Sequence, residues 1–167
     1  MTGWQSAARD PRAMAAGTYS MIILQALASL ALRVALAIPF WRSGLVRWDG
    51  FLALKPATKY LYENEYALNL LAQLKLVEKA PLLPYADIFA WAGSFAEIIL
   101  PAALVIGFAT RLSALGLLGM TIVIFMVNPA SWPNEALPWA AMALALIVYG
   151  PGLFSIDRLI WNAVRGR

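Results

Sequence analysis

The stretch from Tyr85 to Val127, YADIFAWAGSFAEIILPAALVIGFATRLSALGLLGMTIVIFMV, decides the fold of this 167-residue chain. It consists of two apolar segments that are separated only by Thr110-Arg111. Roughly 20 mostly apolar residues are enough for a helix to cross about 30 Å of hydrocarbon. A proline such as Pro101 is tolerated inside a membrane helix, where it usually gives a kink. The pattern therefore predicts two transmembrane helices, over about 85–108 and 112–127, joined by a very short turn.

Two further apolar segments flank this pair, over about 19–41 and 137–149. The last is short, and Gly150-Pro151-Gly152 ends it. Hydrophobic residues make up 62% of the chain and charged residues 13%, whereas soluble domains are nearer half apolar and a quarter charged. We predict an all-α integral membrane protein, a bundle of four transmembrane helices in one domain over 19–161. A flexible tail (1–18) and a basic tail (162–167) flank the predicted domain.

The first apolar segment could also be a signal peptide, since Ala26-Leu27-Ala28 resembles a cleavage site. The apolar stretch before that site is short, however, and Gln25 breaks it. Hydrophobicity then continues as far as Phe40. A retained transmembrane span is the better interpretation.

The first connection, from Arg42 to Leu83, is mixed in character. Within it, apolar residues recur at helical spacing: Ala67, Leu70, Leu71, Leu74 and Val77. This pattern predicts an amphipathic helix that lies in the membrane interface. A helix that packs on the end of the bundle would show the same pattern, and both interpretations remain open.

Basic residues are scattered along the chain and lie mostly at the ends of apolar segments. The net charge of +4 therefore predicts contact with membrane lipid, and we expect no nucleic-acid partner. Lys and Arg are nearly balanced between the two sides of a four-span topology. The third connection has no basic residue, and this favours an outward position for it and cytoplasmic termini.

The chain contains no Cys and no His. Disulfides, thiol chemistry and His or Cys metal ligands are therefore excluded, and we expect no metal site. Any redox chemistry would need a bound electron carrier or a partner subunit.

Two ionisable residues, Arg33 and Glu97, fall well inside predicted spans. A charge at the bilayer centre costs about 2.5–3.5 kcal/mol even on insertion scales, so each needs a partner or a function. Counted from Trp41 and Tyr85, their depths differ by roughly 6 Å, which a long Arg side chain can span. We predict an Arg33–Glu97 ion pair, either a lock between two helices or part of a polar site. Gln25 and Tyr149 are weaker candidates for that intramembrane site.

Four motifs together resemble the DoxX family of four-helix membrane proteins. The run at 32–51, LRVALAIPFWRSGLVRWDGF, is similar to the family's first span, with its intramembrane Arg and a Ser-Gly followed by a basic residue. The run at 95–115 is similar to its second span and turn, and GPGLFSID at 150–157 to its closing motif. The ENEY segment at 63–66 suits a subgroup of the family. The matching motif residues are Ser43, Gly44, Arg47, Gly107, Thr110, Arg111, Gly150, Pro151, Gly152, Ser155 and Asp157.

The resemblance implies a bacterial inner-membrane protein, with members linked to membrane oxidoreductase complexes that pass electrons to quinone and to oxidative-stress responses. It suggests a subunit of a redox-linked complex, with other protein subunits as partners and a quinone near Arg33 and Glu97. The absence of Cys does not support sulfur chemistry through protein thiols. The alternative is a non-catalytic membrane scaffold in which Arg33–Glu97 is a structural ion pair. Whether the chain is an enzyme stays open at this stage.

Overall fold

The computed structural model describes residues 11–50 and 52–166, with side chains from residue 17 onward. Within these ranges the fold is all-helical and contains no β-strand, as predicted. Three helices are long and apolar enough to cross a membrane, over Gly17–Val46, Ala86–Ile106 and Thr110–Val127.

Helix α2 (Pro11–Val46) is the longest element, with 36 residues and a length of about 54 Å at 1.5 Å per residue. It begins earlier than the predicted span and includes residues 11–18, which we had expected to form part of a flexible tail. A proline in the first helical turn and alanines after it favour this early start. Residues 1–10 of the predicted tail lie outside the described residues.

Helices α5 (Ala86–Ile106) and α6 (Thr110–Val127) match the predicted second and third spans closely. The turn between them is as short as expected. Gly107 ends α5 with a positive φ of 72°, a conformation that glycine adopts without a steric penalty. Its missing side chain also makes room for the Arg33 guanidinium and for Ser155, both of which an added Cβ would meet.

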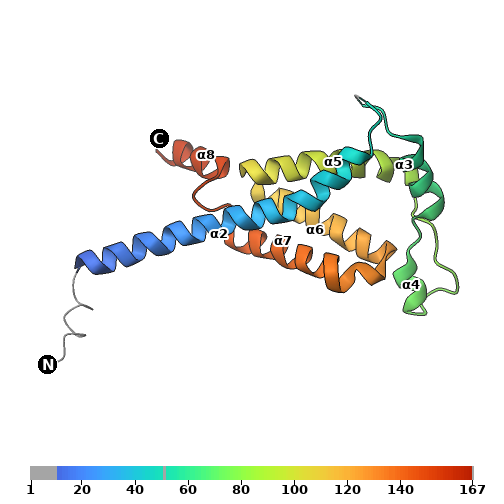
Figure 1. The fold of residues 1–167 in the computed structure, drawn as a ribbon, viewed down its shortest axis with the longest axis horizontal. Helices are drawn as coiled ribbons and strands as arrows, with labels where there is room; N and C mark the ends of the chain where they lie inside the picture. The colour runs from blue at the N-terminus through green and yellow to red at the C-terminus, as the bar shows by residue number, and fades with distance from the viewer. Residues whose placement is uncertain (1–10, 51, 167) are drawn as a thin grey trace.

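Helix α7 (Leu137–Tyr149) has the predicted bounds. Two short irregular helical segments, η2 (Pro129–Ser131) and η3 (Trp132–Ala136), lead directly into it. Helix α2 packs on α5 and α7, while α6 packs on the same two helices, so the four form a bundle (Figure 1). Its core contains large apolar residues from all four helices: Leu36, Phe40, Leu104, Leu117 and Leu146.

The first connection folds over one end of the bundle, as α3 (Pro56–Tyr60), η1 (Leu61–Glu65) and α4 (Asn69–Gln73) (Figure 1). The predicted amphipathic helix is limited to the five residues of α4. The Asn69 side-chain amide donates a hydrogen bond of 2.7 Å to the carbonyl of Val127, the last residue of α6. This contact supports the interpretation in which the segment packs on the end of the bundle.

Helix α8 (Ile156–Arg165) lies at the opposite end, near the middle of α2 (Figure 1). Ser155 caps it, since its hydroxyl accepts a hydrogen bond from the Arg158 amide. Several of its apolar side chains are exposed: Leu159, Ile160, Trp161 and Val164. We call this end of the bundle the α8 end, and the end covered by the first connection the α3 end.

Candidate functional site

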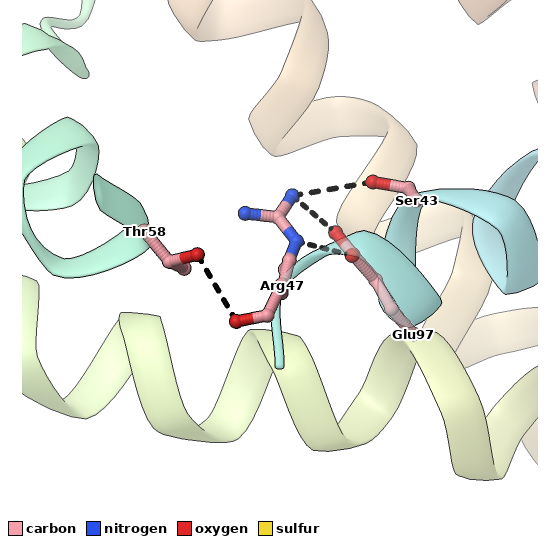
Figure 2. Close-up of polar contacts among 4 residues, drawn as sticks. All are labelled: Ser43, Arg47, Thr58 and Glu97. Atoms are coloured by element: carbon pink, nitrogen blue, oxygen red, sulfur yellow. Dashed lines mark hydrogen bonds and ion pairs between the residues drawn. The ribbon is translucent and has the colours of Figure 1, made fainter. Parts of the chain in front are cut away.

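Glu97 lies on the face of α5 that is buried in the bundle, and its carboxylate is paired with Arg47. The Arg47 Nη2 donates to Glu97 Oε1 at 2.7 Å, and Nε contacts Oε2 in a close ion pair. Nη2 also lies 3.4 Å from the Ser43 hydroxyl (Figure 2). The fork of a guanidinium fits a carboxylate in this two-pronged manner, which a lysine could not reproduce.

The prediction that Glu97 pairs with Arg33 is therefore wrong. It assumed that Trp41 and Tyr85 lie at the same level. In the structure Gly44, three residues beyond Trp41, packs against the backbone of Glu97, so close that an added Cβ would lie 3.0 Å from its carbonyl carbon. Arg33 instead lies level with Val105, to whose carbonyl its Nη1 donates at 3.3 Å. The antiparallel register of α2 and α5 thus separates the two charges.

The first connection closes over the Arg47–Glu97 pair. The Thr58 hydroxyl donates to the Arg47 carbonyl at 3.2 Å (Figure 2), and the Arg47 guanidinium lies 5.3 Å from the ring centre of Tyr62. Burial alone would lower the pKa of Arg47, but hydrogen bonds and charge from Glu97 outweigh it and raise that pKa. Burial of the phenol raises the pKa of Tyr62 to about 12. Both groups are thus held in their ordinary protonation states, as cation and neutral phenol.

An aromatic cluster adjoins the pair, formed by Trp48, Trp91 and Phe95. The ring of Trp48 lies 4.9 Å from that of Phe95 and 6.0 Å from that of Trp91. Two buried donors in this region, Trp48 Nε1 and Ser94 Oγ, have no hydrogen-bond partner among the described residues. A buried polar atom without a partner costs free energy, so such atoms are worth examining as ligand contacts.

Arg33 is fully buried, and it fastens the loop that follows α7. Its Nη2 donates to the Phe154 carbonyl at 2.5 Å. Nearby, the Ser29 hydroxyl donates to the Gly150 carbonyl at 3.2 Å. Both contacts join α2 to the closing loop, and Arg33 thereby satisfies backbone carbonyls that would otherwise lie unpaired in an apolar region.

The other predicted site residues lie at the α8 end. Gln25 and Tyr149 are exposed and line a cavity there, together with motif residues that include Thr110, Arg111 and Gly150. Asp157 caps α6: its two oxygens accept hydrogen bonds from the amides of Ala109 and Thr110, at 2.7 and 2.8 Å. The four predicted site residues are thus divided, with Glu97 nearer the α3 end and the others toward the α8 end.

Sequence reasoning missed Trp48, Thr58, Tyr62 and Ser94 as neighbours of the charged pair. Arg47 was singled out only through the family motif. Among the described residues, no group of three or more acidic side chains could hold a metal ion.

Comparison with known proteins gives one match. The model of the DoxX family matches residues 28–129, more than half of the chain. This region contains Arg33, Arg47, Glu97 and Arg111. No curated protein and no solved structure matches the chain.

Proposed function

Since this chain belongs to the DoxX family of membrane proteins, we propose that it is a subunit of a redox-linked complex in the bacterial inner membrane. In this proposal it crosses the membrane four times and offers a quinone a docking site beside Arg47 and Glu97. The buried charges, the aromatic cluster and the family membership together support it.

The fourth crossing is supported by the helical run that precedes α7. From Pro129 to Tyr149 the chain is continuously helical, if η2, η3 and α7 are taken together. These 21 residues extend about 30 Å, which is the thickness of the hydrocarbon core. Four crossings place the beginning of α2 and α8 on one side, and we propose that this side is cytoplasmic. The first connection then caps the outer end of the bundle at the membrane surface.

The main support for the quinone site is that Nη1 of Arg47 and two donors nearby have no hydrogen-bond partner in the part of the chain that the structure describes. Glu97 and Ser43 occupy Nε and Nη2, whereas Nη1 has no hydrogen-bond partner within the described chain (Figure 2). Trp48 Nε1 and Ser94 Oγ add two further donors. A quinone headgroup presents carbonyl acceptors on a flat ring, which suits N–H donors set among aromatic faces.

The electrons must come from elsewhere in this proposal. Without Cys or His, the chain has no thiol or imidazole ligand for an iron–sulfur cluster or a haem. A partner subunit that carries the electron donor is therefore required, and the present chain holds and orients the acceptor.

Trp48→Phe tests the site with little change in shape, because it removes the unpartnered N–H and keeps an aromatic ring. The purified full-length protein would be extracted with organic solvent and its quinone content measured, before and after incubation with decylubiquinone. We expect quinone content to fall several-fold relative to Trp139→Phe, a matched control in which the same substitution alters a ring that packs against Phe40. Equal quinone content in both variants, or no quinone in the wild type, would refute the proposal.

A non-catalytic scaffold is the second candidate, and it is favoured because Arg47 already occupies the Glu97 carboxylate. Both carboxylate oxygens are already bound by Arg47, as expected of a pair that only joins α2 to α5. The double variant Arg47→Glu, Glu97→Arg would then restore the thermal stability lost in each single variant, and neither it nor the wild type would retain quinone.

A further inference from the structure

A cavity of about 1060 Å³ lies at the α8 end of the described structure. Its walls come from α2, the beginning of α6, the end of α7 and the start of α8. Most of the lining is apolar, with side chains such as Ile22, Leu32 and Leu146. This site is remote from Arg47 and Glu97, so the inference does not depend on the proposed quinone site.

Two arginines at the cavity have charges that no carboxylate pairs within the described residues. Arg111 makes one long contact, 3.4 Å from its Nη2 to the Val148 carbonyl, and its guanidinium lies beside Gly150. The side chain of Arg158 is exposed and makes no ion pair there. Asp157, the one acidic residue in the lining, already accepts the two amides at the N-terminus of α6. Two guanidinium donors thus remain available for an external anion.

Thr110 gives an independent indication that the cavity receives a polar group. Its side chain is fully buried, it lines the cavity, and its Oγ1 has no hydrogen-bond partner among the described residues. A hydroxyl in this position costs free energy unless something in the cavity pairs with it. Since Asp157 already occupies the amides at the N-terminus of α6, we expect the ligand to pair with the Thr110 hydroxyl and the two guanidinium groups.

The surroundings of the cavity favour a lipid over a water-soluble anion. The exposed apolar side chains of α8, among them Leu159 and Val164, need an apolar phase, and the guanidinium of Arg165 lies 4.2 Å from the ring centre of Trp161. Such an amphipathic helix lies in the headgroup region. Where the structure describes side chains, the α8 end has four arginines, Arg33, Arg111, Arg158 and Arg165, and one carboxylate, Asp157, whereas the α3 end has six basic and seven acidic residues. An anionic surface therefore attracts the α8 end more strongly.

We propose that this cavity binds an anionic phospholipid, with its phosphate at Arg111 and Arg158 and its acyl chains against α2 and α7. The hydroxyl of Thr110 pairs with a headgroup or ester oxygen. Arg33 and Ser29 keep the site open without a ligand, because they fix the closing loop to α2 through the carbonyls of Phe154 and Gly150. Only a small part of the binding free energy is then spent on ordering the loop.

Native mass spectrometry of the full-length, delipidated protein tests this proposal, with palmitoyl-oleoyl phosphatidylglycerol as ligand and phosphatidylcholine of the same chains for comparison. We expect phosphatidylglycerol to be retained about tenfold better, a difference of roughly 1.4 kcal/mol, because both lipids carry the phosphate but only phosphatidylcholine adds a cationic group that the two guanidinium groups repel. Arg111→Gln with Arg158→Gln should abolish that preference. The control Arg42→Gln removes an exposed arginine at the other end of the bundle and should preserve it.

Thr110→Val separates a built site from general attraction to charge, because it alters no charge and little volume. We expect it to weaken phosphatidylglycerol retention several-fold without lowering the melting temperature. Equal retention of the two lipids by the wild type would overturn the proposal. So would an equal loss of the preference for phosphatidylglycerol in Arg42→Gln and in the Arg111, Arg158 double variant. Full displacement of the lipid by millimolar inorganic phosphate or by decylubiquinone would overturn the choice of phospholipid as the occupant.

Discussion

At the scale of single residues, the sequence predicted which charges are buried but not which of them pair. A single charged residue inside a long apolar segment must be buried in the membrane, where it needs a partner. Arg33 and Glu97 could therefore be recognised as buried charges from the sequence. Their partners depend on the register of α2 against α5, which close packing at Gly44 determines. Arg33 is compensated by backbone carbonyls, a type of partner that no sequence pattern reveals.

Tyr62 leads to a prediction for the alkaline range. Its pKa is about 12 in the folded protein against about 10 in an unfolded chain. A raised pKa in the folded state means that the neutral phenol contributes stability below pH 10, and that this contribution is lost as the pH rises to 12. We therefore expect the melting temperature of the wild type to fall more steeply between pH 10 and 12 than that of Tyr62→Phe. Parallel curves for the two proteins would show that the Tyr62 phenol is not buried as described.

At the scale of elements, the long apolar helices were predictable and the short ones were not. The bounds of α5, α6 and α7 could be predicted because each apolar segment ends at a glycine, a proline or the Thr110-Arg111 turn. The segment at 67–77 has the periodicity of a helix, yet only α4 forms. A helix of five residues such as α4 is too short to be stable alone. The hydrogen bond from the Asn69 side chain to the end of α6 determines its position.

The turn between α5 and α6 can be tested at Gly107. An alanine there would have to adopt a positive φ and would meet the Arg33 guanidinium and Ser155, so we expect Gly107→Ala to lower the free energy of unfolding by about 2 kcal/mol or more.

Gly119 is the matched control for this turn. It lies within α6 with no atom near an added Cβ, and alanine is the better helix former, so Gly119→Ala should raise stability by up to about 1 kcal/mol. Thermal melts in one detergent compare the two variants, and equal effects would exclude a special role for the turn.

At the scale of the whole molecule, composition was enough to predict a membrane protein, whereas the direction of insertion is a proposal. The absence of native cysteine makes the topology directly testable. Asn128→Cys lies in the third connection and Asn162→Cys in α8, and both positions are exposed. In intact cells we expect a membrane-impermeant maleimide to label Asn128→Cys only, with Asn162→Cys labelled after permeabilisation. The reverse pattern would invert the orientation, and labelling of both in intact cells would exclude the fourth crossing.

Both candidate functions depend on the Arg47–Glu97 pair, which a comparison of two double-mutant cycles tests directly. The free energy of unfolding in detergent would be measured for Arg47→Met, Glu97→Gln and their combination, and for the same cycle with Arg33→Met. Removing one partner of a buried pair costs about 3–5 kcal/mol and leaves the other partner uncompensated. We therefore predict a coupling of at least about 2 kcal/mol between Arg47 and Glu97 and less than about 0.5 kcal/mol between Arg33 and Glu97. The opposite ranking of the two couplings would contradict the account.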